Sequence, residues 1–403
     1  MMPFSLKKGV HLSFLNALFT STSAVCVTGL VVVDTADSFT AIGQAIVAAL
    51  IQIGGLGIAS VGVGLIIAAG KRVSIKSRLM VKEALNVDTY GGMVRLVRVV
   101  LAITLGFEAV GAIISFFVFR KDYSPLHAVG ISIFHSIAAF NNAGFDNLGG
   151  MHNLIPYKDN ILLNITTDVL VIVGGIGFLV LVDIVKQKSF KKLCLHSKVA
   201  ISMTAVLLIG GTLILKATEN ITWMGAFFQR MTTRTAGFNT INISEMSEAS
   251  KAVMILLMLI GGSPGSTAGG MKTTTFSVLI LNAIATFRSQ ENAGAFGRRL
   301  EYHVIKNAAT IAMLYFALFF GGGIAISVYE GLPLLNCLYE AASAVGTVGL
   351  TLGITPELHV FSQVVLIILM YLGRVGGLTL IYAVFSGRNK GNAKLPLEKI
   401  TVG

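Results

Sequence analysis

The chain has 403 residues, of which 54% are hydrophobic and only 12% are charged. A soluble protein carries about 25% charged residues, so the composition excludes a chain of several water-facing domains and indicates that most of it lies in lipid. The surplus of 31 lysines and arginines over 19 acidic residues gives a net charge of +12, which in a membrane protein is more typical of cationic cytoplasmic loops than of a nucleic-acid partner.

Long apolar segments recur along the chain. A bilayer core about 30 Å thick needs roughly 20 apolar residues per helix, so each segment is expected to cross the membrane. Segment 251–287 is too long for one straight span and is interrupted by Gly-Gly-Ser-Pro-Gly-Ser. In chain order, the expected spans are 41–69, 92–119, 160–185, 199–217, 251–287, 303–329 and 358–386.

The connections between these spans alternate in charge. By the positive-inside rule the basic connections face the cytoplasm, which also places the C-terminus inside. The cations lie at Lys71, Arg72, Lys76, Arg78, Lys82, Lys186, Lys188, Lys191, Lys192, Lys198, Arg288, Arg298, Arg299, Lys306, Arg388, Lys390, Lys394 and Lys399. The opposite connections hold Asp34, Asp37, Asp146, Glu219, Glu245, Glu248, Glu330 and Glu357.

A fourfold repeat lies in the outer connections, where half-length apolar stretches at 16–30, 131–145, 224–238 and 336–350 each end in a glycine and one further residue. An aromatic residue precedes each glycine by ten positions. These aromatics are Phe19, Phe134, Phe227 and Tyr339, and the glycines are Gly29, Gly144, Gly237 and Gly349. A second glycine cluster follows each copy, at Gly54-Gly55, Gly174-Gly175, Gly261-Gly262 and Gly373.

These stretches are too short to span a membrane and too apolar for an aqueous loop. We therefore expect re-entrant pore helices, since irregular backbone at membrane depth persists only where protein buries it or where it lines a watery cavity. Four helix–pore-helix–helix units that point the same way would surround a single pore. The alternative is that the glycines are only packing notches between helices, which would not account for half-length helices at fourfold spacing.

The residues at the glycines are suited to a monovalent cation. Each short helix would aim its carbonyl end at the axis, and each glycine permits the positive φ that turns a carbonyl toward an ion. A ring of aspartate or glutamate, as expected for Ca²⁺, does not occur at these positions, so K⁺ is favoured. The predicted filter loops are Val27, Thr28 and Gly29; Asn142, Ala143 and Gly144; Thr235, Ala236 and Gly237; and Thr347, Val348 and Gly349.

The filter loops and the segments that follow them resemble the KtrB-type membrane subunits of the Ktr/Trk/HKT superfamily of potassium transporters. The matching stretches include TSTSAVCVTGLVVVDT, IQIGGLGI, FHSIAAFNNAGFD, RTAGFN, LMLIGGSPGSTAGGMKTTTF and GRVGGLTL, and they cover the chain from about residue 12 to its end. The resemblance implies a homodimer in the cell membrane on a cytosolic KtrA-like ring of regulatory subunits. ATP or ADP would bind only that ring, and Na⁺ is a possible activator.

The predicted repeats are 1–70, 92–186, 199–288 and 302–388, followed by a cytoplasmic tail at 389–403. The first repeat departs from the family, because only eleven residues with two lysines precede its pore helix. This segment is too short to cross the bilayer. We therefore expect that the first helix of repeat one is missing and that the natural start lies upstream.

An intramembrane gate is expected below the filter. Arg374 lies within the last span, where a cation is costly unless it faces a cavity or a partner, and the interruption of repeat three is at the equivalent place. The resemblance assigns a gating role to both positions; the alternative is that Arg374 only ties helices together. The expected gate consists of Arg374 and the loop residues Gly261, Gly262, Ser263, Pro264, Gly265, Ser266, Thr267, Gly269 and Gly270.

Other polar residues support weaker interpretations. Glu108, Asp168 and Asp183 could be Na⁺ or proton sites, or could pair between helices. Arg234 adjoins the third filter loop, whereas Asp34 and Asp146 could attract cations at the outer mouth or be simply solvated. His135 and Glu340 are interpreted as hydrogen-bond anchors for the filter backbone.

Enzyme and metal sites are not predicted. The string Gly261–Gly265 matches the G-x-S-x-G pattern and GSTAGGMKT nearly matches a P-loop, but both lie within an apolar span with no preceding strand. The three cysteines and seven histidines have no paired spacing. We therefore expect an all-α polytopic membrane protein that carries K⁺ inward; the alternatives are a secondary carrier of another small cation or solute and a membrane-embedded hydrolase.

Overall fold

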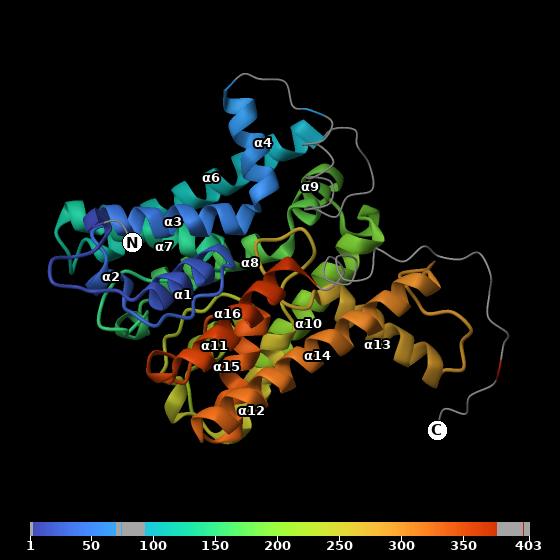
Figure 1. Ribbon diagram of the computed structural model, residues 1–403. Coiled ribbons are helices and arrows are strands. Elements are labelled where there is room, and N and C mark those ends of the chain that lie inside the picture. The colour runs from blue at the N-terminus through green and yellow to red at the C-terminus, as the bar shows by residue number, and fades with distance from the viewer. Residues whose placement is uncertain (1–2, 70–73, 75–92, 377–397, 399–403) are drawn as a thin grey trace.

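The computed structural model describes residues 3–69, 74, 93–376 and 398 (Figure 1). Over these residues the fold is helical apart from one small hairpin, which confirms the all-α prediction. The α-helices are α1 (Phe14–Val25), α2 (Thr35–Ser38), α3 (Ala41–Leu56), α4 (Ile58–Ala68), α6 (Met93–Phe119), α7 (Pro125–Phe140), α8 (Ile161–Ile176), α9 (Phe178–Gln187), α10 (Leu195–Thr218), α11 (Trp223–Thr232), α12 (Glu248–Leu259), α13 (Thr273–Phe287), α14 (Tyr302–Glu330), α15 (Leu334–Gly346) and α16 (Val360–Val375). Shorter elements are η1 (Pro3–Ser5), η2 (Ile155–Tyr157), η3 (Phe190–Lys192), η4 (Ile243–Glu245) and η5 (Thr355–Glu357), with strands β1 (Gly294–Ala295) and β2 (Arg298–Arg299) pairing as the hairpin.

Three helices are long and apolar enough to cross a bilayer as single segments: Val94–Phe119, Leu195–Thr218 and Tyr302–Glu330. Only 28% of the most apolar window of each is buried within the protein, which leaves the rest of its apolar surface for lipid. These helices correspond to the spans predicted at 92–119, 199–217 and 303–329.

The spans predicted at 41–69 and 160–185 are not straight helices, which corrects the sequence-based expectation. The first is a pair bent by 104° after Leu56, and the second is a pair bent by 94° after Ile176. A glycine separates the two halves of each pair, and Gly57 and Gly177 have φ of +81° and +101°. Residues in an α-helix have negative φ, so a glycine in this conformation ends the first half and redirects the second.

The remaining predicted spans are also interrupted within the described residues. In 251–287, α12 and α13 are separated by the loop 260–272. In 358–386, α16 ends at Gly376, whose φ of +87° repeats the conformation of Gly57 and Gly177, and the predicted continuation lies outside the described residues. A helix break therefore follows the second glycine cluster in repeats one, two and four, whereas in repeat three the cluster Gly261-Gly262 lies within the break itself.

Four short helices occupy the positions predicted for the pore helices (Figure 1). Helices α1, α7, α11 and α15 contain 12, 16, 10 and 13 residues, fewer than a bilayer crossing requires. Three of the four aligned aromatics, Phe19, Phe134 and Tyr339, are buried. The exception is in α11, where Phe227 is only partly buried and the next residue, Phe228, is fully buried.

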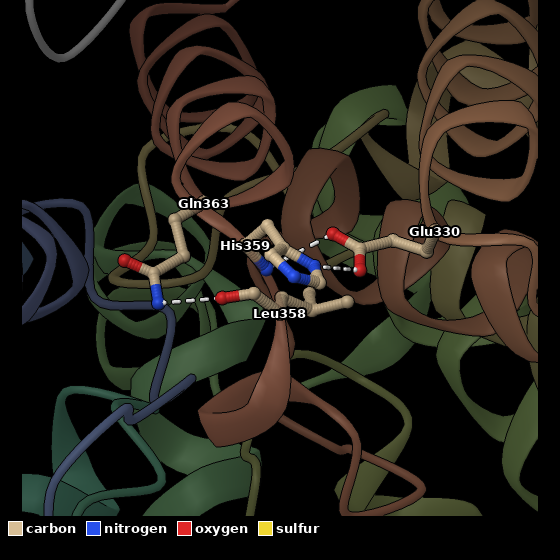
Figure 2. A network of polar contacts seen from close by, with 4 residues as sticks. All are labelled: Glu330, Leu358, His359 and Gln363. Carbon is tan, nitrogen blue, oxygen red and sulfur yellow. Dashed lines mark hydrogen bonds and ion pairs between the residues drawn. The ribbon is translucent and has the colours of Figure 1, made fainter.

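An acidic clamp joins the end of α14 to the start of α16 in repeat four (Figure 2). Glu330, the last residue of α14, accepts hydrogen bonds from the backbone N–H of His359 at 3.0 Å and from its Nδ1 at 2.7 Å. His359 caps the start of α16, where a carboxylate is favoured by the helix dipole. Glu219 makes the same connection in repeat three, accepting from the N–H of Ser247 at 2.7 Å where α12 begins. The clamps fix the frame that holds α15 and α11.

Candidate ion pathway

The four glycines of the filter loops lie next to one another in a closed ring. A Cβ added to Gly29 would lie 3.1 Å from the Cα of Gly144, and one added to Gly144 would lie 2.6 Å from the Cα of Gly237. The ring closes through Gly349, which is 3.4 Å from a Cβ on Gly237 and whose own Cβ would be 2.9 Å from the Cα of Gly29. Segments more than 90 residues apart in the chain therefore converge around one axis, with no room for any side chain at these positions.

The backbone of the four filter loops has the same unusual conformation. The glycines have φ of +96°, +66°, +76° and +93°, as their expected role requires. Two residues earlier, a non-glycine residue also has positive φ in every loop, which the sequence did not indicate. These residues are Val27, Asn142, Thr235 and Thr347, with φ between +51° and +63°. Such conformations are costly for side-chain residues and cluster at functional sites.

Hydrogen bonds to the ends of the pore helices hold the filter loops in place. The N–H groups of Thr28, Ala143 and Val348 each donate to a carbonyl five residues earlier, at 2.8 Å. Ser23 and Ser343 add a second contact, because their hydroxyl oxygens accept from the N–H of the filter glycine at 3.1 and 3.0 Å. These serines occupy the same position in repeats one and four, six residues before the glycine, a regularity that the aligned sequences contain.

His135 and Glu340, predicted as anchors for the filter backbone, are buried but make their hydrogen bonds outside the filter loops. Glu340 accepts hydrogen bonds from the hydroxyls of Thr351 and Thr355, both at 2.7 Å, and from the N–H of Leu352 at 2.9 Å. His135 lies 2.9 Å from the hydroxyl of Thr167. Both therefore anchor a pore helix to the structure around it, and Glu340 does so through the segment that follows the fourth filter loop.

Three threonine hydroxyls of the filter loops lack a partner among the residues that the structure describes. Thr28, Thr235 and Thr347 are fully buried, and their Oγ1 atoms make no hydrogen bond there. A buried hydroxyl without a partner costs about 1–3 kcal/mol. Because these hydroxyl oxygens have no partner and lie next to the ring of glycines, they are suited to contact a cation or its water.

The interruption of repeat three, 261–270, lies directly against the filter loops and is called the gate loop here. Two of its backbone N–H groups donate to the second glycine cluster of repeat two: Ser263 to the carbonyl of Gly175 at 3.0 Å and Thr267 to that of Gly174 at 3.1 Å. A Cβ on Gly269 would lie 3.0 Å from Cγ2 of Thr347. The gate loop is thus docked across the ring, not free.

Arg374 holds the gate loop from the opposite side. Its guanidinium donates to the carbonyl oxygens of Thr267 in the gate loop and of Gly54 in repeat one, and to that of Gly55 at 3.1 Å. The predicted gate residues are therefore brought together, and Arg374 occupies the place taken by the second glycine in Gly54-Gly55. The contacts show that Arg374 also ties helices together, so the two interpretations are compatible.

Two further arginines are fully buried, although the sequence singled out only Arg234 as a neighbour of the third filter loop. One NH2 group of Arg234 donates to the Gly175 carbonyl at 3.1 Å, to Thr204 Oγ1 at 2.9 Å and to Ser263 Oγ at 3.5 Å. Arg230 instead donates to the carbonyl of Leu207 at 2.7 Å and to Thr233 Oγ1 at 2.6 Å. Of these two arginines, Arg234 contacts the gate loop and Arg230 does not.

The other acidic residues are spread around the pathway. Glu108 accepts a hydrogen bond from Asn141 Nδ2 at 3.0 Å, at the end of α7. Asp183 accepts one from the N–H of Cys194 at 3.0 Å, and both residues are far in sequence from the filter glycines. Asp34 accepts from the N–H of Met151 at 2.8 Å. Asp146 accepts from the N–H of Leu148 at 3.1 Å, so the two outer acids brace loops of repeats one and two.

The two catalytic-looking strings take part in packing. The Ser263 hydroxyl lies 3.1 Å from that of Thr273, and the Lys272 ammonium donates to the carbonyl of Ala268 at 2.7 Å. Within the described residues, no group of three or more metal-ligating side chains is found.

Comparison with known proteins gives a consistent result. Residues 3–390 match the family model of TrkH, described as a cation transport protein. The chain is 38% identical to the potassium/sodium uptake protein NtpJ of Enterococcus hirae and 37% identical to the Ktr system potassium uptake protein B of Bacillus subtilis. Both alignments cover 100% of this chain and 92% of the relative.

A solved structure has the same fold. The crystal structure of the potassium transporter TrkH from Vibrio parahaemolyticus matches with a TM-score of 0.75, covering 93% of this chain and 79% of that one. At 20% sequence identity, the match is evidence for the fold alone.

Proposed function

Because the chain belongs to the TrkH family of cation transport proteins and is a multi-pass membrane protein, we propose that it takes up K⁺ through the ring of four glycines. Membrane potential supplies about 2.3 kcal/mol per charge per 100 mV. Inward movement of K⁺ then needs no ATP hydrolysis by this subunit. The observation that carries the proposal is the closed order of contacts from Gly29 through Gly144, Gly237 and Gly349.

The filter loops would select the ion by replacing its hydration shell. The positive φ of each glycine lets backbone carbonyls turn toward the axis, and the buried hydroxyls of Thr28, Thr235 and Thr347 add oxygen atoms. The carbonyl ends of α1, α7, α11 and α15 contribute partial negative charge. The filter loops contain no carboxylate, which supports a monovalent cation rather than Ca²⁺.

The gate loop and Arg374 would close the pathway on the inner side of the filter. A guanidinium near the axis raises the local potential and opposes passage of a cation, while its hydrogen bonds keep the gate loop docked. Opening would require the contacts of Ser263 and Thr267 with Gly175 and Gly174 to be released. Arg234 would act as a positioning residue, because it shares the Gly175 carbonyl with Ser263.

Assembly and control complete the proposal. The relative named as part of a Ktr system supports a partnership with a regulatory subunit. We propose that this partner is a cytosolic KtrA-like ring that binds ATP or ADP. We also propose that the membrane subunit is a homodimer with a cytoplasmic C-terminus. The relative named as a potassium/sodium uptake protein supports a role for Na⁺ as activator or as second transported ion.

Growth of a K⁺-uptake-deficient bacterium at low K⁺ tests the proposal. Expression of this chain together with a KtrA-like subunit should restore growth, and radioactive Rb⁺ uptake with and without Na⁺ should separate Na⁺ activation from Na⁺ transport. Absence of K⁺ or Rb⁺ uptake, although the protein is present in the membrane with its partner, would contradict the proposal.

A further inference from the structure

A basic cavity lies away from the ion pathway, where α9 leads into α10. It has a volume of about 410 Å³ and is lined by residues of α9, η3 and the start of α10 together with the β1–β2 hairpin. The hairpin reaches it through its turn, where Phe296 and Gly297 have φ of +52° and +72°. Two segments about 100 residues apart thus form one site.

The lining of this cavity is strongly cationic. Lys191, Lys192, Lys198 and Arg298 contribute four cations, against one carboxylate from Asp183. The Asp183 carboxylate already accepts the N–H of Cys194 at 3.0 Å. In the described part of the chain none of these cations forms an ion pair, because the only ion pairs found there involve histidines. The cavity is therefore built to attract an anion that the described residues do not supply.

Exposed apolar side chains surround the cavity. Phe296 packs edge-on against Phe190 with ring centroids 6.0 Å apart, and these rings are 50% and 45% exposed. Lys198 donates its ammonium to the carbonyl of Lys191 at 2.8 Å and lies over the Phe296 ring. Beyond the cavity, the span α10 exposes a row of apolar residues. These are Val206, Ile209 and Leu213.

We propose that this cavity binds the phosphate headgroup of an anionic phospholipid, with its acyl chains along α10. Basic pockets at the cytoplasmic ends of membrane helices are suited to such headgroups. An acidic protein partner would also satisfy the charge, but it would not account for the exposed apolar side chains of Phe296 and of α10. The lipid headgroup neutralises the lysines and the lipid tails cover the exposed helix face.

Retention of lipid by the purified full-length protein tests this inference. The wild-type protein is exchanged into micelles that contain phosphatidylglycerol or phosphatidylcholine, and native mass spectrometry counts the lipids that remain bound. The test variant combines Lys192→Gln with Arg298→Gln, two exposed residues that line the cavity. The matched control combines Lys188→Gln with Arg299→Gln, which removes the same charge from exposed neighbours outside the cavity.

We expect the wild-type protein to retain phosphatidylglycerol in preference to phosphatidylcholine, and the test variant to lose that preference by about tenfold while the control keeps it. Equal loss in both variants would reveal only a diffuse surface charge and would overturn the site. So would the absence of a preference in the wild-type protein, or retention in the test variant. Displacement of the lipid by millimolar inorganic phosphate would assign the cavity to a free anion instead. Lost binding of the KtrA-like subunit, with lipid retention unchanged, would assign it to a protein.

Discussion

The filter loops and the layer beneath them differ in symmetry, although both are built from the same four repeats. In the filter, all four loops have a positive φ at the glycine and again two residues earlier. Beneath it, Gly54, Gly174 and Gly373 abut the end of their own pore helix, but repeat three has the gate loop and repeat four has Arg374. If the proposed function holds, the comparison teaches that a ring which surrounds an ion requires equivalent members, whereas a barrier across the axis requires only one or two specialised ones.

The largest effect is expected where the symmetric layer is broken. In Gly349→Ala the new Cβ would lie 2.9 Å from the Cα of Gly29 at a φ of +93°, so the ring must distort. We expect Rb⁺ uptake to fall about a hundredfold. The matched control is Gly321→Ala in the same repeat, where nothing lies within 4 Å of the added Cβ. Equal activity of the two variants would contradict the assignment of the filter.

In the layer beneath the filter, substitutions should raise the flux of Rb⁺ instead of lowering it. Arg374→Gln removes charge-assisted hydrogen bonds to the carbonyls of Thr267, Gly54 and Gly55, which releases the gate loop. Rb⁺ flux in liposomes without the cytosolic subunit should rise about tenfold. Removing residues 263–269 should have a similar effect, and adding Arg374→Gln to that deletion should change nothing further. Unchanged flux in both variants would refute the gate.

Two equally buried arginines sharpen the comparison, because only one contacts the gate loop. Arg234→Met removes the contacts with Gly175 and Ser263, whereas Arg230→Met removes a buried charge that bonds elsewhere. We expect flux without the cytosolic subunit to rise about threefold in Arg234→Met and to stay unchanged in properly folded Arg230→Met. If both variants behave alike, Arg234 does not position the gate loop.

The smallest effect concerns the outer mouth. Burial, followed by the nearby charges of Asp34 and Asp37, raises the pKa of Asp146 from 3.8 to about 6. The hydrogen bond from the N–H of Leu148 and the charge of His152 lower this pKa and so oppose the shift. Ionisation of Asp146 therefore lowers the free energy of unfolding. This loss of stability appears as pH rises through the range from 3.8 to about 6.

Lowering the external pH from about 7.5 to about 5 should neutralise Asp146 and raise the KM for Rb⁺ about twofold, because fewer cations gather at the mouth. Asp146→Asn should remove this pH dependence. A wild-type KM that is constant over this range would show that Asp146 does not attract the ion.

The sequence predicted the parts of the site that the repeat makes regular. The glycines, the half-length helices and the gate loop all follow from the spacing of apolar residues and from Gly-Gly-Ser-Pro-Gly-Ser. The bends at Gly57 and Gly177 were missed, because a glycine that packs closely and one that adopts positive φ look the same in a sequence. The role of Arg234 was missed because its partners are backbone carbonyls and hydroxyls on segments 29 to 59 residues away.

Location of the transported ion tests the central claim most directly. Crystals of the protein grown with Rb⁺ in place of K⁺ give an anomalous signal that places the ion independently of the chain. The account predicts a peak on the axis among the carbonyl oxygens next to Gly29, Gly144, Gly237 and Gly349. Ordered Rb⁺ bound elsewhere in the protein, with none inside the ring, would contradict it.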